Sequence, residues 1–195
     1  MKRKSNISRV TKETDIKIEI NLDGSGETDI ATGIPFFDHM LSLFAVHGFF
    51  DLAIKAAGDL NVDFHHTVED IGIVLGQSFS KALGDRRGIC RYGHGAVPMD
   101  EAFSRVNVDL SNRPYLVYNL PETIRSSGPF DAYLAREFFR AFSVQAGMNL
   151  HINAEYGENE HHILESVFKA MGRALNRACS MDSRISGVLS SKGSL

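Results

Sequence analysis

His65-His66-Thr67-Val68-Glu69 is a stretch that the chain contains twice, since 96 positions later it reads His161-His162-Ile163-Leu164-Glu165. The 195 residues include eight histidines, and four of them lie in these two HHxxE copies. The similarity extends outward, because residues 39–56 align with residues 137–154 after a small length adjustment. Self-similarity at a fixed spacing is the sign of a repeated structural unit. The sequence therefore predicts a fold made of two related halves.

Each HHxxE copy is predicted to open an amphipathic helix. Apolar or small residues follow each copy at alternating steps of four and three positions, which is the spacing of one helical face. The two faces comprise Val68, Gly72, Leu75, Phe79 and Ala82 in the first half, and Leu164, Phe168, Met171, Leu175 and Ala178 in the second. A shorter amphipathic helix is predicted before each of them, at about residues 35–46 and 132–146.

Strands are predicted between the paired helices and where apolar and polar residues alternate. Residues 52–54 and 150–152 are strand-like runs between the helices, and further strands are expected at 15–22, 103–110 and 115–119. Sheets packed against helices are the expected layering.

The length favours one domain over residues 1–195, built of two pseudo-repeats at about 1–90 and 91–195. The turn-forming run Ser126-Ser127-Gly128-Pro129 marks the best internal boundary. Residues 186–195 are rich in serine and glycine, and composition alone predicts a frayed tail.

Composition excludes several classes of protein. The chain is 43% hydrophobic and 23% charged, as in ordinary globular proteins, and its net charge of -3 gives no positive field for binding nucleic acid. No segment approaches the roughly 20 apolar residues that cross a bilayer, and no apolar signal region follows Lys2-Arg3-Lys4. Cys90 and Cys179 have no second cysteine nearby, so we read both as reduced thiols. We expect a cytoplasmic protein without a membrane partner.

The HHxxE copies carry residue types that bind transition-metal ions. On a helix, Glu69 shares a face with His65 and His66, which lie four and three positions before it. Adjacent histidines project about 100° apart, so two ions are the natural solution. One histidine of each pair is expected to bind the ion of its own half, and the other to reach across to the second ion. His39 and its repeat equivalent Glu137 add a ligand-competent side chain to each half.

Other polar residues fit both a site and an ordinary surface. Asp63 and Asp70 are candidates for orienting the imidazoles, although acids that flank a helix start are common. His47 and His94 are equally compatible with site and surface, and His151 lies on a predicted strand as a packed or exposed residue. No nucleotide-binding glycine motif, HExxH or GxSxG occurs.

Over nearly its whole length the sequence resembles the imidazoleglycerol-phosphate dehydratase family, whose enzymes act in histidine biosynthesis. The resemblance rests on the second HHxxE copy and on RVTKET (9–14), GIPFFDHML (33–41), DFHHTVED (63–70), PMDEA (98–102) and SSKG (190–193). It implies an α+β fold of duplicated ββαβα-type halves, with β-sheets packed against helices (ribosomal protein S5 domain 2-like). It also implies two Mn ions per site and a homo-oligomeric shell of twenty-four subunits with sites at the interfaces.

The resemblance assigns roles residue by residue. The implied metal ligands are His39, His65, His66, Glu69, Glu137, His161, His162 and Glu165. The implied substrate contacts are Glu13, His47, Arg91, Arg113, Ser190, Ser191 and Lys192. Position 137 is often His in the family and is Glu here, and Leu189 stands where the family commonly has Pro.

The implied reaction removes water from imidazoleglycerol phosphate and gives imidazole acetol phosphate. The hydrogen that leaves carbon is not next to a carbonyl, so we expect two ions to stabilise the deprotonated imidazole ring, whose electrons expel the hydroxyl. Glu13 is the candidate for the carbon-bound proton, and the other expected catalytic residues are His47, Glu69 and Glu165. Arg91, Arg113 and Lys192 are expected to hold the phosphate.

Two other functions are compatible with the residues alone. One is a binuclear metal phosphatase, in which a metal-activated water attacks phosphorus, and the other is a noncatalytic metal-binding shell protein. An assay with imidazoleglycerol phosphate separates the three, because only the lyase gives a keto product that retains its phosphate.

Overall fold

A computed structural model describes residues 3–121, 124 and 128–195 of the chain. Lys2 of the basic run, and Ser126 and Ser127 of the predicted boundary turn, lie outside the described residues. Among the described residues, none of the helices combines the length and hydropathy that a membrane span requires.

The two halves have the same order of elements. The first half consists of β1 (Lys4–Val10), β2 (Thr14–Asn21), β3 (Thr28–Ala31), α1 (Pro35–Gly48), β4 (Asp51–Gly58) and α2 (His65–Leu83). The second consists of β5 (Tyr92–Met99), β6 (Ala102–Asp109), β7 (Tyr115–Asn119), α3 (Ala132–Ala146), β8 (Asn149–Tyr156) and α4 (Glu160–Cys179). The sheet orders β1-β2-β4-β3 and β5-β6-β8-β7 correspond strand by strand. The predicted α+β fold of duplicated halves is confirmed.

Each half contains one strand more than the expected ββαβα pattern. β3 pairs parallel with β4, and β7 pairs parallel with β8, while the other neighbours are antiparallel. The sequence predicts β7 at its observed bounds, but it gives no strand at β1, β3 or β5. β1 and β3 carry few apolar residues and are exposed edge strands, so they lack a pronounced alternation.

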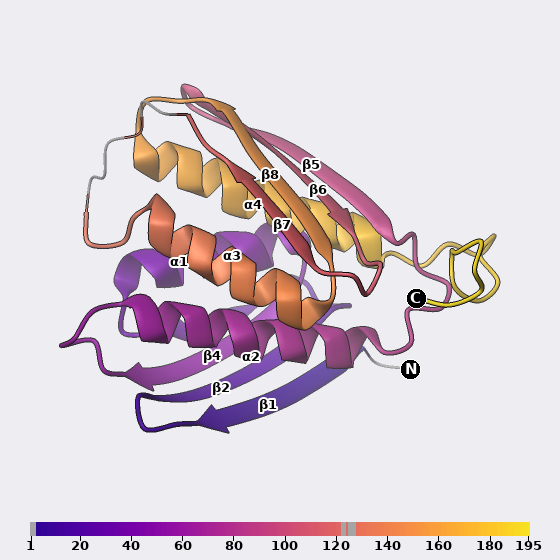
Figure 1. Cartoon of the computed structure of the whole chain (residues 1–195), viewed down its shortest axis with the longest axis horizontal. Helices are drawn as coiled ribbons and strands as arrows, with labels where there is room; N and C mark the ends of the chain where they lie inside the picture. The colour runs from indigo at the N-terminus through magenta and orange to yellow at the C-terminus, as the bar shows by residue number, and fades with distance from the viewer. Residues whose placement is uncertain (1–2, 122–123, 125–127) are drawn as a thin grey trace.

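The four helices lie between the two sheets (Figure 1). α2 packs on β1 and β2, and α4 packs on β5 and β6. The shorter helices cross between the halves, because α1 packs against α4 and α3 packs against α2. Each HHxxE helix therefore has as its neighbour a helix from the other repeat.

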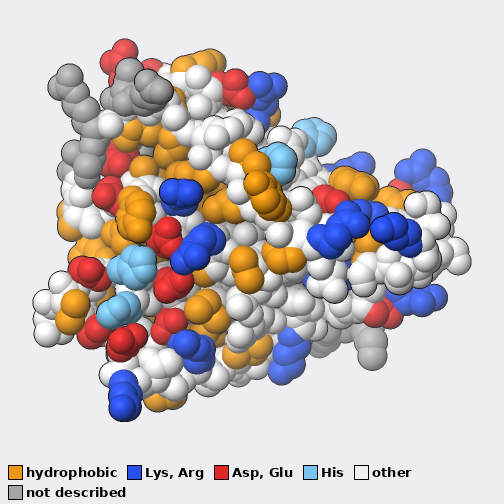
Figure 2. All heavy atoms as spheres, viewed as in Figure 1, with side chains coloured by type: hydrophobic (Ala, Val, Ile, Leu, Met, Phe, Trp, Pro, Cys, Tyr) orange, Lys and Arg blue, Asp and Glu red, His pale blue; other side chains and the backbone are white. Residues whose placement is uncertain are grey.

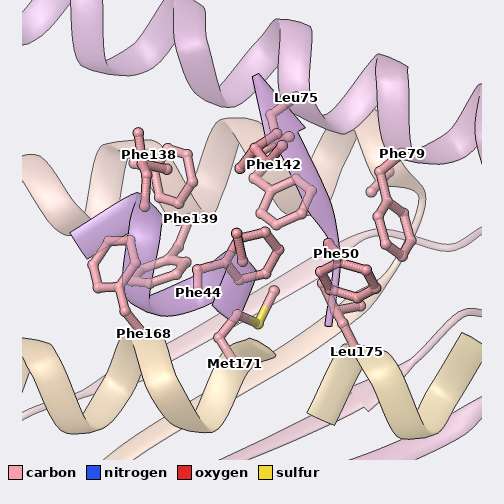
Figure 3. Close-up of a cluster of buried hydrophobic side chains, with 14 of the residues drawn as sticks. Phe44, Phe50, Leu75, Phe79, Phe138, Phe139, Phe142, Phe168, Met171 and Leu175 are labelled. Atoms are coloured by element: carbon pink, nitrogen blue, oxygen red, sulfur yellow. The ribbon is translucent and has the colours of Figure 1, made fainter. Parts of the chain in front are cut away.

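Phenylalanines from all four helices form the centre of the core (Figure 3). The ring of Phe142 on α3 lies 6.0 Å from that of Phe44 on α1 and 5.9 Å from that of Phe79 on α2. Phe168 on α4 stacks on Phe138 at 5.7 Å. Truncating one such side chain to alanine costs about 3–5 kcal/mol. The core thus fixes the helices, and with them the side chains at the start of each HHxxE helix.

The tail has no helix or strand, but hydrogen bonds tie it to the body of the protein. The amide of Gly88 donates to the carbonyl of Gly187 at 2.7 Å, and Arg91 donates to the carbonyl of Leu189 at 2.6 Å. Composition predicts a frayed end because serine and glycine bury little apolar area. It gives no sign of these polar contacts.

Candidate active site

The first group of candidate ligands is His39, His161 and Glu165, which we call the α4 cluster. His39 lies on α1, and the other two lie one turn apart at the start of α4. Oε1 of Glu165 is 2.9 Å from Nε2 of His39 and 3.0 Å from Nε2 of His161. One ligand atom from each residue lies within 4.8 Å of the others. Two imidazoles and a carboxylate that converge in this way fit a transition-metal ion.

Glu165 is held in its charged form. Burial opposes its ionisation, but hydrogen bonds from Lys169, His39 and His161 outweigh that effect and lower its pKa to about 2. Nζ of Lys169, one turn further along α4, lies 2.5 Å from Oε2 of Glu165. One carboxylate oxygen therefore faces the imidazoles, and the other is bound by a cation.

The second group, the α2 cluster, consists of His65, Glu69 and Glu137. The first two lie at the start of α2, and Glu137 lies on α3, at the position that corresponds to His39. Nε2 of His65 is 3.9 Å from Oε2 of Glu69. Arg140 of α3 lies between the carboxylates, with Nη2 3.0 Å from Oε1 of Glu69 and 2.8 Å from Oε2 of Glu137. The predicted ligand Glu137 is thus near the site, but Arg140 engages one of its oxygens.

The second histidine of each pair contacts different residues. Nδ1 of His66 lies 3.0 Å from Oδ2 of Asp59, and its hydrogen bond with Asp59 raises the pKa of His66. Nδ1 of His162 lies 2.6 Å from Oε2 of Glu101. A carboxylate on Nδ1 fixes the ring orientation and leaves Nε2 as the nitrogen for a ligand. The division of each pair between two ions stays a prediction.

Asp59 and Glu101 were not predicted as partners of the histidines. The two predicted partners, Asp63 and Asp70, make other contacts. Asp63 accepts a hydrogen bond from the backbone N–H of His65, and Asp70 binds Thr14 and Arg9. Glu101 lies in the PMDEA segment, which offered a signal. Asp59 follows β4 in a turn and is brought to His66 by the tertiary fold, as Arg140 is to Glu69, whereas Lys169 lies one helical turn from Glu165 and was missed although it follows from helix spacing.

The predicted phosphate contacts meet at a different place in the chain. Arg91, Arg113, Ser190, Ser191 and Lys192 line one pocket of about 390 Å³. Nε of Arg91 donates to Oδ1 of Asp109 at 2.7 Å, and this bond raises the pKa of Arg91. Guanidinium, ammonium and hydroxyl groups around one hollow suit a phosphate.

The clusters and this pocket lie at opposite ends of α4. His161 is at the start of the helix, while the backbone N–H of Arg91 bonds to Ala178 at its end. A helix of 20 residues is about 30 Å long. Figure 2 shows histidine and acidic side chains grouped at the left of one face, and Lys and Arg side chains on the projecting right end. One chain cannot present both places to one small molecule.

The remaining candidates lie at several different places in the fold. Oε2 of Glu13, at the β1–β2 turn, lies 3.9 Å from Nδ1 of His66. His47, two turns after His39 on α1, has its pKa lowered by burial and then by the charges of Lys169 and Arg173. His94 on β5 and His151 on β8 are exposed strand residues outside both clusters and the pocket.

Comparison with known proteins gives one consistent result. Residues 32–175 match the family model described as imidazoleglycerol-phosphate dehydratase. An imidazoleglycerol-phosphate dehydratase from Desulfosudis oleivorans is 61% identical over 193 residues, which cover 99% of each chain. The crystal structure of the Staphylococcus aureus dehydratase superposes with a TM-score of 0.82 at 40% identity, over 92% of this chain and 99% of the other. The Pyrococcus furiosus dehydratase, in complex with (S)-C348, gives 0.85 at 37% identity, over 97% of this chain and 100% of the other.

Proposed function

Because the chain belongs to the imidazoleglycerol-phosphate dehydratase family and is a hydro-lyase of histidine biosynthesis, we propose that it dehydrates its substrate with two manganese ions. The observation that carries this proposal is the convergence of His39, His161 and Glu165 from two helices. The α2 cluster has His65, Glu69 and Glu137 at the corresponding positions of the other half, but among the described residues only the α4 cluster brings three ligand atoms within 4.8 Å of one another. Each cluster would hold one ion.

The ions would act on the imidazole ring of the substrate. When bound, they would supply positive charge that favours the deprotonated ring, whose electrons would expel the hydroxyl group from the adjacent side-chain carbon. Glu13 accepts the proton that leaves carbon, since its carboxylate is half exposed and lies 3.9 Å from the His66 ring. Asp59 and Glu101 orient His66 and His162 as ligands through their Nδ1 atoms. His47 is a further group at the substrate.

The phosphate is held by the pocket at the far end of α4. Arg91 is fixed by two bonds to Asp109 and one to the tail, so its position is set before the substrate arrives. Arg113 and Lys192 add positive charge, while Ser190 and Ser191 supply hydroxyl donors. Binding energy at the phosphate then positions the reacting carbon.

Complete sites require more than one chain. The clusters and the phosphate pocket are about a helix length apart in a single chain, which supports a site made of the clusters of one subunit and the pocket of another. His66 and His162, which lie outside the clusters of their own chain, would complete the clusters of neighbours. A closed shell of twenty-four subunits provides such shared sites many times over.

The test is an assay of the purified protein with and without metal. Protein stripped by a chelator should be inactive with imidazoleglycerol phosphate, and two equivalents of Mn²⁺ per chain should restore a keto product that retains its phosphate. Full activity in verified metal-free protein would refute the metal proposal. Release of inorganic phosphate would indicate the phosphatase instead.

A further inference from the structure

Arg140 differs from the other charged residues at the clusters because it binds two carboxylates at once. Its Nη2 lies 3.0 Å from Glu69 and 2.8 Å from Glu137, and its Nε donates to Glu137 at 2.9 Å. The side chain of Glu137 is only 10% exposed, while that of Arg140 is 55% exposed. The partly exposed guanidinium thus neutralises a nearly buried carboxylate.

The other half of the fold has a different pair of residues at these positions. Glu137 corresponds to His39, and Arg140 corresponds to Ser42, whose hydroxyl donates to the carbonyl of Asp38 on its own helix. The α4 cluster therefore has an imidazole and a serine hydroxyl where the α2 cluster has a carboxylate and an arginine. The added negative charge of Glu137 and the added positive charge of Arg140 offset each other.

Lys169 does not have the same effect on the α4 cluster. Of the two carboxylate oxygens of Glu165, it binds Oε2, while Oε1 remains with the two imidazoles. Arg140 instead links the two carboxylates of the α2 cluster, and Nε2 of His65 stays 3.9 Å from Glu69. A dication that enters the α2 cluster must share both carboxylates with this positive charge or displace it toward solvent.

We propose that Arg140 is a built-in counter-cation that weakens ion binding at the α2 cluster, so that the two ions of each chain bind in order, the α4 cluster first. This inference rests on the proposed metal-dependent function. Its physical basis is that a positive charge beside two ligands disfavours the binding of a metal cation there. Because the arginine side chain is partly exposed, it can turn toward solvent when an ion binds.

The experiment is a titration of the chelator-stripped, full-length enzyme with Mn²⁺, in which electron paramagnetic resonance counts the free ion. The wild-type protein should show two phases, and His65→Ala and His161→Ala should identify the weaker and the tighter phase. Arg140→Gln should tighten the weaker phase by about threefold to thirtyfold, as expected for the loss of two partly exposed ion pairs. The tighter phase should not change.

Arg136→Gln is the matched control, because Arg136 is exposed and lies one turn earlier on α3. This substitution removes the same charge as Arg140→Gln. Its titration should match that of the wild type. The double variant Glu137→His with Arg140→Ser gives the α2 cluster the residues of the other half, and its two phases should approach each other. Thermal unfolding of each metal-free variant shows whether the fold is retained.

The titrations distinguish a failure of the Arg140 inference from a failure of the proposed metal-dependent function. An α2-cluster affinity that is unchanged or weakened in Arg140→Gln would overturn the role of Arg140, even if both ions bind. A wild-type protein that binds no Mn²⁺ would instead overturn the proposed metal-dependent function.

Discussion

At the scale of single residues, the two histidines of each HHxxE copy have different environments although they are neighbours in sequence. His161 contacts Glu165 through Nε2, whereas His162 contacts Glu101 through Nδ1. The roughly 100° turn between adjacent helical positions separates them. One stretch of backbone thus points its two imidazoles at different surroundings, which is what the proposed two-ion site requires.

Removing one imidazole should therefore disable the enzyme. His66→Ala and His162→Ala, made separately, should each lose most activity and bound manganese, because a site with few ligands rarely tolerates the loss of one. Metal analysis and the dehydratase assay check this. His151→Ala is the control, since that side chain is exposed on β8 and should change little. Two ions per chain retained in either HHxxE variant would contradict the assignment.

Glu101 gives a prediction for pH. The backbone N–H of Asn159, followed by the His162 ring, lowers the pKa of Glu101 to about 2 from an ordinary value of 4.5. A lowered pKa means that the charged group stabilises the fold above about pH 4.5, and that this contribution is lost as the pH falls through 2. Glu101→Gln should thus be less stable than the wild type at pH 7, and the gap should close toward pH 2.

Urea unfolding of metal-free protein between pH 2 and pH 7 measures that gap. Glu155→Gln, a change on β8 that also removes an ion pair with Arg105 at 2.7 Å, is a control for the loss of a charge and of an ordinary surface ion pair. A gap that stays constant with pH would show that the Glu101 carboxylate has no such role.

At the scale of elements, glycines set how closely the helices approach. A Cβ added to Gly72 on α2 would lie 2.7 Å from the carbonyl oxygen of Phe138 and 2.9 Å from Cβ of Ala141, both on α3. Gly172 on α4 would meet the carbonyl oxygen of Phe44 on α1 in the same way. These close approaches hold each HHxxE helix beside the helix that carries the third candidate ligand of its cluster, which is Glu137 on α3 or His39 on α1.

Gly72→Ala should consequently destabilise the protein by about 1–3 kcal/mol, the usual cost of overpacking, despite the better helix propensity of alanine. It should also weaken manganese binding at the α2 cluster, because α3 carries Glu137. Chemical denaturation and a metal titration test both effects. At Gly128, an added Cβ meets no atom of the described residues within 4 Å, so Gly128→Ala should cost less than Gly72→Ala. Equal stability of the two variants would contradict the close-packing argument.

Helices could be predicted from the sequence better than strands. The four-three spacing after each HHxxE copy marks faces that are buried in α2 and α4, and Ala132–Ala146 has the predicted bounds. β5 gave no signal because Gly93 and Gly95 interrupt its pattern. The structure supplies the reason, since an added Cβ at either position would collide with the α4 backbone.

Site residues divide in the same way. Candidate ligands inside a repeated motif could be proposed from spacing, and the Lys169–Glu165 pair also follows from helix spacing, whereas the contacts of Asp59 with His66 and of Arg140 with Glu69 depend on the tertiary fold. The sequence also gave no sign that the phosphate residues lie a helix length from the clusters. That separation is a property of the tertiary fold, because the clusters and the pocket lie at opposite ends of α4.

At the scale of the whole molecule, metal and assembly should be linked. If His66 and His162 complete clusters in neighbouring chains, ion binding and association stabilise each other. A chelator should therefore shrink the particle, and Mn²⁺ should restore it, as light scattering can follow. A large particle that persists after verified metal removal would contradict this linkage.

The tail offers the sharpest test of sites shared between chains. Deletion of residues 190–195 removes Ser190, Ser191 and Lys192 from the phosphate pocket but no apolar core residue. Folding and metal content should stay near normal, while KM rises strongly and kcat falls, because phosphate binding no longer positions the reacting carbon. Kinetic constants within about twofold of the wild type, or roughly 0.4 kcal/mol, would show that the tail is dispensable.

Combining that truncation with a cluster variant tests the geometry directly. His161→Ala lacks a working α4 cluster but keeps its pocket, and the truncated chain keeps its clusters but lacks part of its pocket. If the two ends of α4 serve different sites, random co-assembly of equal amounts should complete about a quarter of the sites. Stripping both inactive proteins of metal, mixing them and adding Mn²⁺ should therefore restore activity that neither shows alone. A mixture that co-assembles by mass analysis but stays inactive would mean that each site takes its clusters and its pocket from one chain, against the length of α4.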